Sequence, residues 1–251
     1  MRREIVKGLL IDLSGTIHID KKEIPGAVEA IRKLRKSGLP YRFATNTTKE
    51  SPQRLRSKLN ALGFDVQDHE IFTSLTACRD LIEAQNLRPL LLMEDAAMEV
   101  FEGVETSDPN AVLNKAFRLI MDSGSPLIAV HKARYFADKD EKLSMGPGGF
   151  VQALEYATGV TATVVGKPTK RFFELALADL GLKDAPETVA MIGDDVSADL
   201  GDGAIEMGFH RYLVKTGKYK EGDEEKLKID NMNNRSKVFN SIVEAIDHVL
   251  Q

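Results

Sequence analysis

Short apolar runs alternate with amphipathic stretches along most of the chain. The first run lies in KGLLIDLSGT at residues 7–16, where three apolar residues precede Asp12 and small residues follow Leu13. A continuous apolar run that ends in turn-forming residues is typical of a buried strand of a parallel sheet. Short segments that are mostly apolar also occur at residues 41–44, 162–165, 189–192 and 211–214. We therefore predict that these segments are strands.

Between the runs, apolar residues recur at helical spacing. Val28, Ile31 and Leu34 form such a stripe, with Pro25 before it and Gly38 after it, as is common at helix ends. Similar stripes predict helices over residues 52–62, 170–180, 200–208 and 238–249. Strands that alternate with helices in this way imply parallel pairing with right-handed crossovers.

The middle of the chain is less regular. It predicts helices over residues 75–85, 112–121 and 150–158, and strands over residues 89–93 and 127–131. This block has the composition of a second, small α/β layer. Nearer the C-terminus, residues 218–228 are rich in both charges and are interpreted as a solvated loop.

Composition narrows the class of protein. The 251 residues are 43% hydrophobic and 29% charged, as in a soluble globular protein. The net charge of −4 and the lack of a basic face argue against nucleic-acid binding. No apolar run approaches the roughly 18 residues of a membrane span, and the start does not resemble a signal peptide. Because Cys78 is the only cysteine, no internal disulfide can form, and we expect a cytoplasmic protein.

Polar residues gather where predicted strands end. They are Asp12, Thr45 and Asn46, Lys167, and Asp194 and Asp195, with Asp199 one helical turn later. Each has a structural alternative. Asp12 can belong to an ordinary turn, Thr45 and Asn46 can cap a helix, and Lys167 can be a surface lysine. The aspartates after the fourth run can pair with a helix dipole.

Taken together, these residues favour a chemical site. Carboxylates that meet at one edge of a sheet repel one another unless a cation lies among them. Mg²⁺ suits such a place, because it takes one or two carboxylates together with substrate phosphate and water. With Lys167 as a fixed positive charge, the pattern indicates an anion site suited to phosphoryl transfer.

Four motifs then carry a resemblance to a known family. In their order, DLSGT at Asp12, TN at Thr45, GKP at Lys167 and GDDVSAD at Asp194 resemble the haloacid dehalogenase-like phosphatases. The spacing is similar to that of members whose cap is inserted between the second and third motifs. The resemblance implies an α/β fold with a doubly wound, Rossmann-like parallel-sheet core at residues 1–77 and 162–251. A smaller α/β cap domain is expected at residues 78–161.

The same resemblance implies roles for individual residues. Asp12 attacks phosphorus and becomes an aspartyl phosphate, and Mg²⁺ is held by Asp12, the Ser14 backbone carbonyl and Asp194. Asp195 or Asp199 stands behind these ligands. The residues expected around the substrate phosphate are Asp12, Leu13, Ser14, Thr45, Asn46 and Lys167. The implied partner is a small phosphorylated substrate or a phosphoprotein, and relatives that pair through the cap imply a homodimer.

The chain departs from the family pattern in two places. Most family phosphatases carry a second aspartate, an acid and base, where this chain has Ser14. A serine hydroxyl is a far weaker acid, so we expect poor turnover of alkyl phosphates and better turnover of pyrophosphate or phosphoramides. In the cap, residues 107–111 run almost directly into residues 113–115, where relatives carry a longer stretch. The sequence leaves open whether this is a true deletion.

Three other functions are weighed against this one. A phosphate- or protein-binding module that keeps the fold and metal but has little turnover is favoured by Ser14. A receiver-type phospho-acceptor is disfavoured because the chain is about twice the length such a domain needs. A dinucleotide-binding function is disfavoured because no strand is followed by G-x-G-x-x-G.

Overall fold

The computed structural model describes residues 5–48, 50–93, 95–106, 113–137, 143–229 and 235–251. The chain divides into two compact units. The first comprises Met1–Thr45, Pro52–Thr73 and Lys167–Gln251, and the second comprises Asn46–Ser51 and Ser74–Gly166. The sequence predicts domain boundaries after residues 77 and 161 and did not predict that Asn46–Ser51 groups with the second unit.

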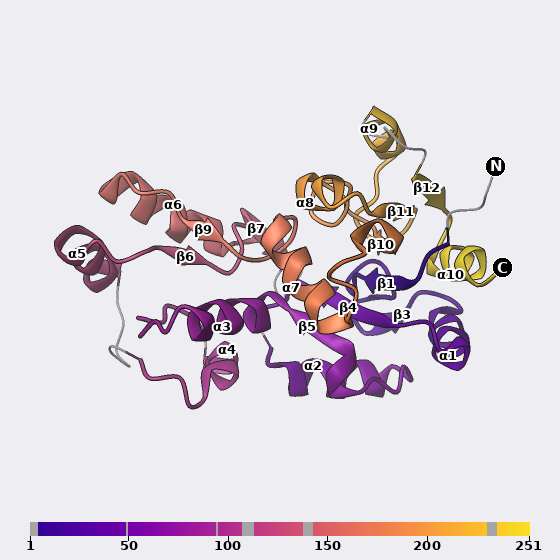
Figure 1. Cartoon of the computed structure of the whole chain (residues 1–251), viewed down its shortest axis with the longest axis horizontal. Helices are drawn as coiled ribbons and strands as arrows, with labels where there is room; N and C mark the ends of the chain where they lie inside the picture. Colours follow the sequence, from indigo (N-terminus) through magenta and orange to yellow (C-terminus); the bar gives the residue numbers. More distant parts are fainter. Residues whose placement is uncertain (1–4, 49, 94, 107–112, 138–142, 230–234) are drawn as a thin grey trace. The chain divides into compact units, whose positions relative to one another are not determined.

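A parallel six-stranded sheet is the centre of the first unit (Figure 1). In spatial order its strands are β12 (Ser236–Phe239), β11 (His210–Val214), β10 (Val189–Gly193), β1 (Gly8–Ile11), β4 (Tyr41–Thr45) and β5 (Ile71–Thr73). From β1 the chain winds outward through β4 to β5, and later from β10 through β11 to β12 on the other side. This reversal beside β1 makes a doubly wound sheet, in which ligands bind at the carboxyl ends near the reversal.

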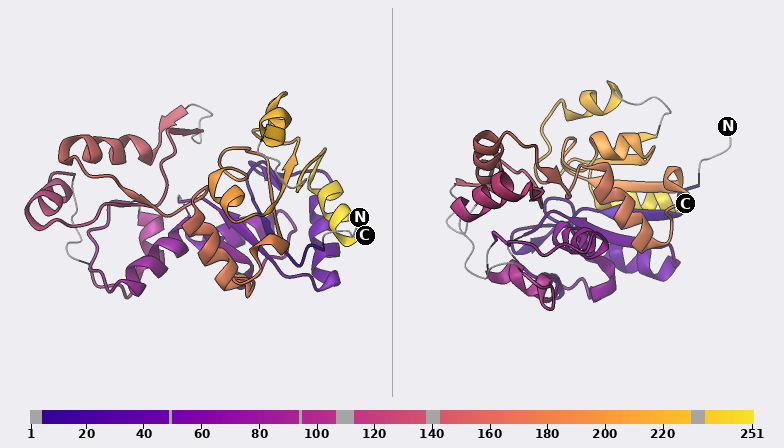
Figure 2. Two further views of the ribbon diagram at one scale, coloured as in Figure 1. Left: turned by 45° about the horizontal axis from the view of Figure 1, so that its top comes forward. Right: turned by 60° about the vertical axis from the view of Figure 1, so that its left-hand side comes forward.

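Helices cover both faces of this sheet. They are α1 (Ala27–Ser37), α2 (Pro52–Ala61), α7 (Lys170–Leu180), α8 (Asp202–Glu206), α9 (Asp223–Ile229) and α10 (Ile242–Leu250). On one face, Ile31 of α1 and Ile246 of α10 share a core with Ile71, and Figure 2 shows these two helices side by side. Because side chains alternate along a strand, Phe72 points to the other face. There it meets Phe172 of α7, with ring centroids 5.3 Å apart.

The second unit is smaller and also mixes helices with strands. Its helices are α3 (Ser74–Ala84), α4 (Asp95–Met98), α5 (Leu113–Ser123) and α6 (Pro147–Thr158). Its strands are the parallel pair β6 (Ile128–Ala129) and β9 (Thr163–Val164) and the antiparallel pair β7 (Tyr135–Ala137) and β8 (Leu143–Met145). Leu75, Cys78 and Phe101 lie in its hydrophobic core. The predicted fold class, a doubly wound α/β core with a smaller α/β unit, is confirmed.

Two predicted strands differ from the structure, one in the middle block and one directly after it. Residues 89–93 form no strand, and Leu91 instead packs in the core of the second unit. The prediction was wrong because a short apolar run can fill a core without pairing with a strand. The run at residues 162–165 does contain β9, but it pairs with β6 and not with the six-stranded sheet.

The C-terminal predictions were also partly wrong. Within residues 218–228, α9 begins with three acidic residues, which suit the positive end of a helix dipole, and it buries Leu227. The last helix begins later than predicted, because β12 occupies residues 236–239 and Ser241 then caps α10. The Ser241 hydroxyl accepts the N–H of Val243 at 3.3 Å. Residues 107–112, where the cap sequence is short, lie outside the described residues.

Two short strands, β2 (His18–Ile19) and β3 (Lys22–Glu23), pair antiparallel after β1. In the described part of the chain, 3₁₀ turns lie at Asp68–Glu70, Glu99–Phe101 and Pro186–Thr188. Among the described residues, none of the helices has the length and apolar character that a membrane crossing requires.

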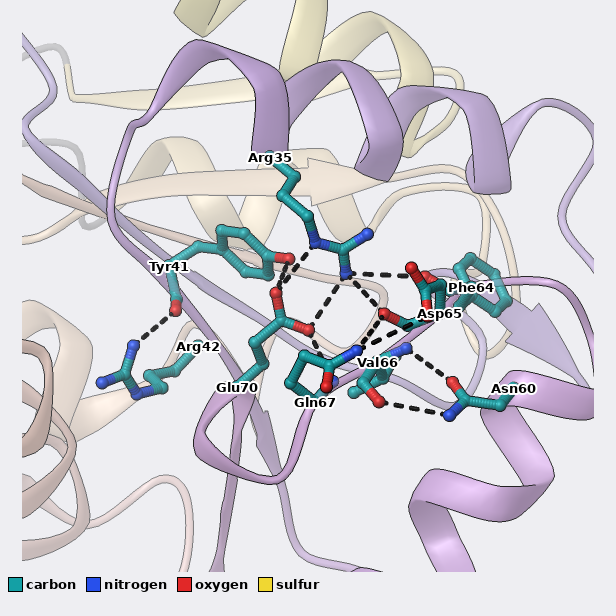
Figure 3. A network of polar contacts seen from close by, with 9 residues as sticks. All are labelled: Arg35, Tyr41, Arg42, Asn60, Phe64, Asp65, Val66, Gln67 and Glu70. Atoms are coloured by element: carbon teal, nitrogen blue, oxygen red, sulfur yellow. Dashed lines mark hydrogen bonds and ion pairs between the residues drawn. The ribbon is translucent and has the colours of Figure 1, made fainter.

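A buried carboxylate ties β4 and β5 to α1 (Figure 3). Glu70 accepts hydrogen bonds from the Tyr41 hydroxyl and from the Arg35 guanidinium, whose Nη2 lies 3.0 Å from Glu70 Oε2. Arg35 also donates to the Asp65 carbonyl at 3.0 Å. Burial alone would raise the pKa of Glu70, but the hydrogen bonds from Arg35 and Tyr41 hold it below its ordinary value of 4.5. The network therefore stabilises the fold in the ionised form of Glu70.

We expect Glu70→Gln to lower the free energy of unfolding by about 2 kcal/mol at pH 7, because it leaves Arg35 without its charged partner. Since the pKa of Glu70 is lowered in the folded state, its contribution is full above the ordinary value and is lost as the pH falls below it. Urea denaturation at pH 7 and pH 3 measures both effects. The matched control is Glu29→Gln, which breaks the exposed pair with Arg32 and should cost less than about 0.5 kcal/mol. Equal losses for the two variants would contradict the account.

Candidate active site

Asp12 follows directly on β1, at the carboxyl end of the central strand. Its N–H donates to the Ile192 carbonyl at 2.9 Å, which extends the ladder with β10 by one residue. Asp12 is only 7% exposed. The strand thus delivers one buried carboxylate to the edge of the sheet where the winding reverses.

Lys167 is the cation of this edge. Its Nζ lies 2.5 Å from Asp12 Oδ1, 2.7 Å from Asp199 Oδ1 and 2.7 Å from the Ala44 carbonyl, so its three N–H donors are all used. Lys167 is 4% exposed, which excludes the alternative of a surface lysine. Burial alone would lower the pKa of Lys167, but the charges of Asp12 and Asp199 outweigh it and raise the pKa. The ammonium is therefore a fixed positive charge.

Three carboxylates meet at this point. Asp12, Asp194 and Asp199 are all buried, and each offers an oxygen within 4.8 Å of the others. Burial, and then the charge of Asp12, raise the pKa of Asp194 to about 6. Burial and the same charge raise the pKa of Asp199, against the pull of Lys167. With all three acids ionised, the ammonium of Lys167, which contacts Asp12 and Asp199, offsets only part of their negative charge, and this favours a bound cation.

One oxygen of the triad shows where a cation fits. Asp194 Oδ2 accepts the backbone N–H of Lys218 at 2.6 Å, whereas Asp194 Oδ1 is buried and has no hydrogen-bond partner among the described residues. A buried carboxylate oxygen without a partner is costly unless a ligand completes it. Oxygen donors of this kind suit a hard cation such as Mg²⁺. The residues present therefore fit a divalent metal.

Asp195 and Asp199 have different positions. Asp199 joins the triad itself, and its Oδ2 accepts the N–H of Asp195 at 3.2 Å. The Asp195 carboxylate instead closes a turn, where Oδ1 accepts the N–H groups of Ser197 and Ala198 at 3.0 and 2.9 Å. Its other oxygen lies 3.6 Å from Lys218 Nζ. Asp195 is thus a structural neighbour of the triad.

The loop after Asp12 holds its backbone in a defined direction. The Gly15 N–H donates to the His18 carbonyl at 2.7 Å, so the Ser14 carbonyl in the same planar peptide points the opposite way. Gly15 has φ +97°, and a methyl group on it would collide with the Asp194 carboxylate. The Ser14–Gly15 peptide therefore lies against Asp194. The Ser14 side chain is exposed, and Leu13 is buried in the core, so only the Leu13 backbone remains for a substrate.

The second motif spans the division between the units. Thr45 is the last residue of β4 and is 3% exposed. Asn46 follows it as the first residue of the second unit and is half-buried. Within that unit Asn46 Oδ1 lies close to Gly166, where a methyl group would come within 2.6 Å of it. Thr45 and Asn46 are thus adjacent in the chain but belong to different units.

Sequence reasoning missed the segment Thr216–Lys218. The Thr216 hydroxyl donates to the Gly15 carbonyl at 2.5 Å, and the backbone of Lys218 binds Asp194. The available signal was Thr-Gly-Lys at residues 216–218, one residue beyond the strand at residues 211–214, since the other motifs also lie close after strands.

Comparison with known proteins agrees with the motifs. A family model described as haloacid dehalogenase-like hydrolase matches residues 9–107, and a second, HAD-hydrolase-like, matches residues 164–245. Human haloacid dehalogenase-like hydrolase domain-containing protein 2 is 50% identical over 98% of this chain and 96% of its own length. Human phospholysine phosphohistidine inorganic pyrophosphate phosphatase is 35% identical over 98% of this chain and 95% of its own length.

Solved structures show the same architecture. A p-nitrophenyl phosphatase from Archaeoglobus fulgidus superposes with a TM-score of 0.84 at 26% identity, covering 97% of this chain and 99% of that protein. NagD from Escherichia coli K-12, at 22% identity, shares the fold with a TM-score of 0.82 over 96% of this chain and 98% of its own. The resemblance predicted from the four motifs is confirmed. This chain belongs to the haloacid dehalogenase-like hydrolase family, and its relatives include phosphatases.

Proposed function

We propose that this chain is a Mg²⁺-dependent phosphohydrolase that uses Asp12 as its nucleophile. The observation that carries the proposal is the buried Asp12 carboxylate held by Lys167 beside Asp194, whose Oδ1 has no partner among the described residues. Asp12, the Ser14 carbonyl and Asp194 would hold the metal. When bound, Mg²⁺ supplies charge neutralisation for the phosphoryl group and the carboxylates around it.

Asp12 would act in two steps. In the first, one of its oxygens forms a bond to phosphorus, and the bond from phosphorus to the leaving group breaks, so that the leaving group departs with the electron pair. In the second, water forms a bond to phosphorus and gives up a proton to solvent, the bond from phosphorus to the Asp12 oxygen breaks, and inorganic phosphate leaves as the Asp12 carboxylate is restored. Among the described residues only Lys167 hydrogen-bonds this carboxylate, at Oδ1. Asp12 Oδ2 therefore keeps its lone pairs either for the attack on phosphorus or for binding the metal.

Lys167 orients the nucleophile and offsets charge. Its contacts with Asp12 and Asp199 hold both carboxylates in place before a substrate arrives. Such preorganisation is the main source of catalysis when a phosphoryl group is transferred. We assign Thr45 and Asn46 to the substrate phosphate, because Thr45 ends the strand next to β1 and Asn46 follows it.

Ser14 sets the expected substrate class. Its hydroxyl is too weak an acid at neutral pH to protonate an alkoxide leaving group, so alkyl phosphates should react slowly. Pyrophosphate and a protonated phosphoramide nitrogen need less help to leave, and we propose that such bonds are the preferred substrates. One relative bears phospholysine, phosphohistidine and inorganic pyrophosphate in its name, which supports this class. The substrate is thus a small phosphorylated molecule or a phosphoprotein.

A second candidate is a phosphate- or protein-binding module with little turnover. Ser14 favours it, because the loss of the acid also removes the base that would activate water for the second step. Two observations favour the enzyme. Asp12 and Lys167 form a buried ion pair, and Asp194 Oδ1 is buried without a hydrogen-bond partner among the described residues.

A screen of phosphomonoesters, pyrophosphate and phosphoramidates tests the proposal, with Asp12→Asn as the blank. We expect Mg²⁺-dependent phosphate release that is faster from pyrophosphate or phosphoramidates than from alkyl esters. Rates equal to the blank on every compound would support the binding module.

We expect Ser14→Asp to raise the turnover of an alkyl phosphate by about tenfold or more, because it supplies the missing acid. Pyrophosphate turnover should change less, since its leaving group needs no proton. Ser14→Asn is the matched control, because asparagine has nearly the same size as aspartate but carries no carboxylic acid. No gain of Ser14→Asp over Ser14→Asn, with the fold and Mg²⁺ binding intact, would show that the missing acid does not limit the turnover of alkyl phosphates.

A further inference from the structure

The segment Thr216–Gly217–Lys218, which follows β11, contacts two parts of the candidate active site at once. The Thr216 hydroxyl donates to the Gly15 carbonyl at 2.5 Å, and the Lys218 N–H donates to Asp194 Oδ2 at 2.6 Å. All of these residues belong to the first unit. One short turn thus joins the loop after β1 to the acid after β10.

Gly217 lets the segment approach this closely. It has φ +58°, and a methyl group on it would collide with the Asp194 carboxylate and with the Cα of Gly15. Gly15 has φ +97° and excludes a methyl group for the same reason, since Asp194 lies against it. The two glycine backbones therefore enclose one side of the Asp194 side chain.

This contact gives the two oxygens of Asp194 different roles. Oδ2 is held by the Lys218 N–H, whereas Oδ1 is buried without a hydrogen-bond partner in the described part of the chain. A carboxylate held through one oxygen presents the other in a fixed direction, as groups behind metal ligands commonly do. The segment thus holds Asp194 Oδ2 and leaves Asp194 Oδ1 available for a cation.

Thr216 acts on the other side of the site. The Gly15 residue is held at both ends, because its N–H donates to the His18 carbonyl at 2.7 Å and its carbonyl accepts from Thr216. The first bond fixes the peptide that carries the Ser14 carbonyl, and the second stops Gly15 from rotating. Loss of the Thr216 hydroxyl would therefore loosen the backbone ligand.

The Lys218 side chain is not part of this contact. Its ammonium lies 3.6 Å from Asp195 Oδ2, its side chain is 67% exposed, and Asp195 closes a turn outside the acid triad. The backbone of the segment, its glycine and the Thr216 hydroxyl carry the contacts.

We infer that Thr216–Gly217–Lys218 is a positioning clamp for a divalent cation. It orients Asp194 through the Lys218 N–H and orients the Ser14 carbonyl through the bond from Thr216 to Gly15. The inference rests on the proposed function, in that it requires a cation held by Asp12, Ser14 and Asp194. Thr216 is a positioning residue, since it acts through Gly15.

The test is Mg²⁺ binding to the full chain by isothermal titration calorimetry, without substrate. We expect Thr216→Val to raise the Mg²⁺ dissociation constant by about 10-fold to 100-fold, the usual range for a group behind a metal ligand. Thr216→Ser keeps the hydroxyl and should stay within about threefold of the wild type. In phosphate-release assays, saturating Mg²⁺ should restore most of the kcat of Thr216→Val, because the clamp does not touch the reacting atoms.

A second pair of variants makes the test independent of Thr216. Gly217→Ala should also weaken Mg²⁺ binding by about tenfold or more, because its methyl group meets Asp194. Gly222→Ala is the matched control, since Gly222 has a similar backbone with φ +95° but nothing lies within 4 Å of an added methyl group. It should bind Mg²⁺ like the wild type, although both substitutions strain a turn.

The outcomes separate two failures. If the wild type binds Mg²⁺, Asp194→Asn does not, and Thr216→Val and Gly217→Ala bind like the wild type, then the clamp is wrong and the metal site stands. Equal impairment of Thr216→Ser and Thr216→Val would also overturn the clamp. If the wild type itself binds no Mg²⁺, the metal site of the proposed function fails and the clamp fails with it.

Discussion

Replacing Asp12 with asparagine is expected to lower Mg²⁺-dependent phosphate release by at least about 10³-fold. The amide introduced in place of the carboxylate cannot attack phosphorus as a carboxylate does, and the change removes one of the proposed metal ligands. Asp12 is the only carboxylate that the central strand itself delivers to the sheet edge, and it is already oriented by Lys167. The assay is phosphate release from pyrophosphate and from acetyl phosphate.

The matched control for this variant is Asp247→Asn. Asp247 is an exposed acid of α10 that pairs with Lys33, and it is far from the triad in sequence. We expect wild-type rates from Asp247→Asn. Phosphate release by Asp12→Asn at the wild-type rate would show that another residue, or water alone, attacks phosphorus.

Replacing Lys167 with methionine is expected to have the second-largest effect. Methionine has a similar length but no donors, so Asp12 and Asp199 lose their shared ammonium, and the Ala44 carbonyl loses a donor. Removal of one partner from a buried ion pair costs about 3–5 kcal/mol of folding stability. We also expect turnover to fall by about 10²-fold to 10³-fold, since a preorganised charge at the reacting group is lost.

Urea denaturation and phosphate release measure these two effects. Lys170→Met, at an exposed position three residues later, is the matched control and should change stability by less than about 0.5 kcal/mol. The stability loss of Lys167→Met should shrink in acid, because the pKa values of Asp194 and Asp199 are raised and their protonation removes repulsion that Lys167 offsets. Stability losses that are equal in the two variants would contradict the role of Lys167.

The regular parts of the fold could be predicted from the sequence because they repeat one physical pattern. The apolar runs that became β1, β10 and β11 are buried on both faces, and the helices between them carry apolar stripes ended by glycine. The run at residues 89–93 had the same composition without being a strand, because Leu91 packs into a small core with no partner strand beside it in the described part of the chain. Local pattern does not contain that information.

In the candidate active site, too, some residues could be predicted from the sequence and others could not. Asp12, Lys167 and Asp194 could be predicted because each polar residue directly follows a strand or, for Lys167, precedes a helix, and parallel strands bring such residues to one edge. Thr216 and Gly217 carry only the weak signal of lying shortly after a strand, because their contacts use a hydroxyl and backbone atoms, which no periodic or charge pattern marks. The close approach of Gly15 and Gly217 exists only once β1 and β11 lie in the same sheet.

Ser14 is expected to affect how much phosphorylated enzyme accumulates during turnover. Without a second acid and base, we expect water to attack the aspartyl phosphate slowly, so that the phosphorylated enzyme accumulates during turnover of a good leaving group. Ser14→Asp should reduce that accumulation. The unusual residue thus makes the intermediate easier to observe.

The most direct measurement is chemical trapping of phosphate on Asp12. The wild type is mixed with Mg²⁺ and acetyl phosphate, quenched in acid and treated with borohydride, which reduces an acyl phosphate to the alcohol. Peptide mass spectrometry should then find homoserine at position 12 in the wild type and none in a sample that lacked acetyl phosphate. Phosphate release without any homoserine at position 12, or with the reduced residue at Asp194 or Asp199 instead, would contradict the assignment of Asp12 as the nucleophile.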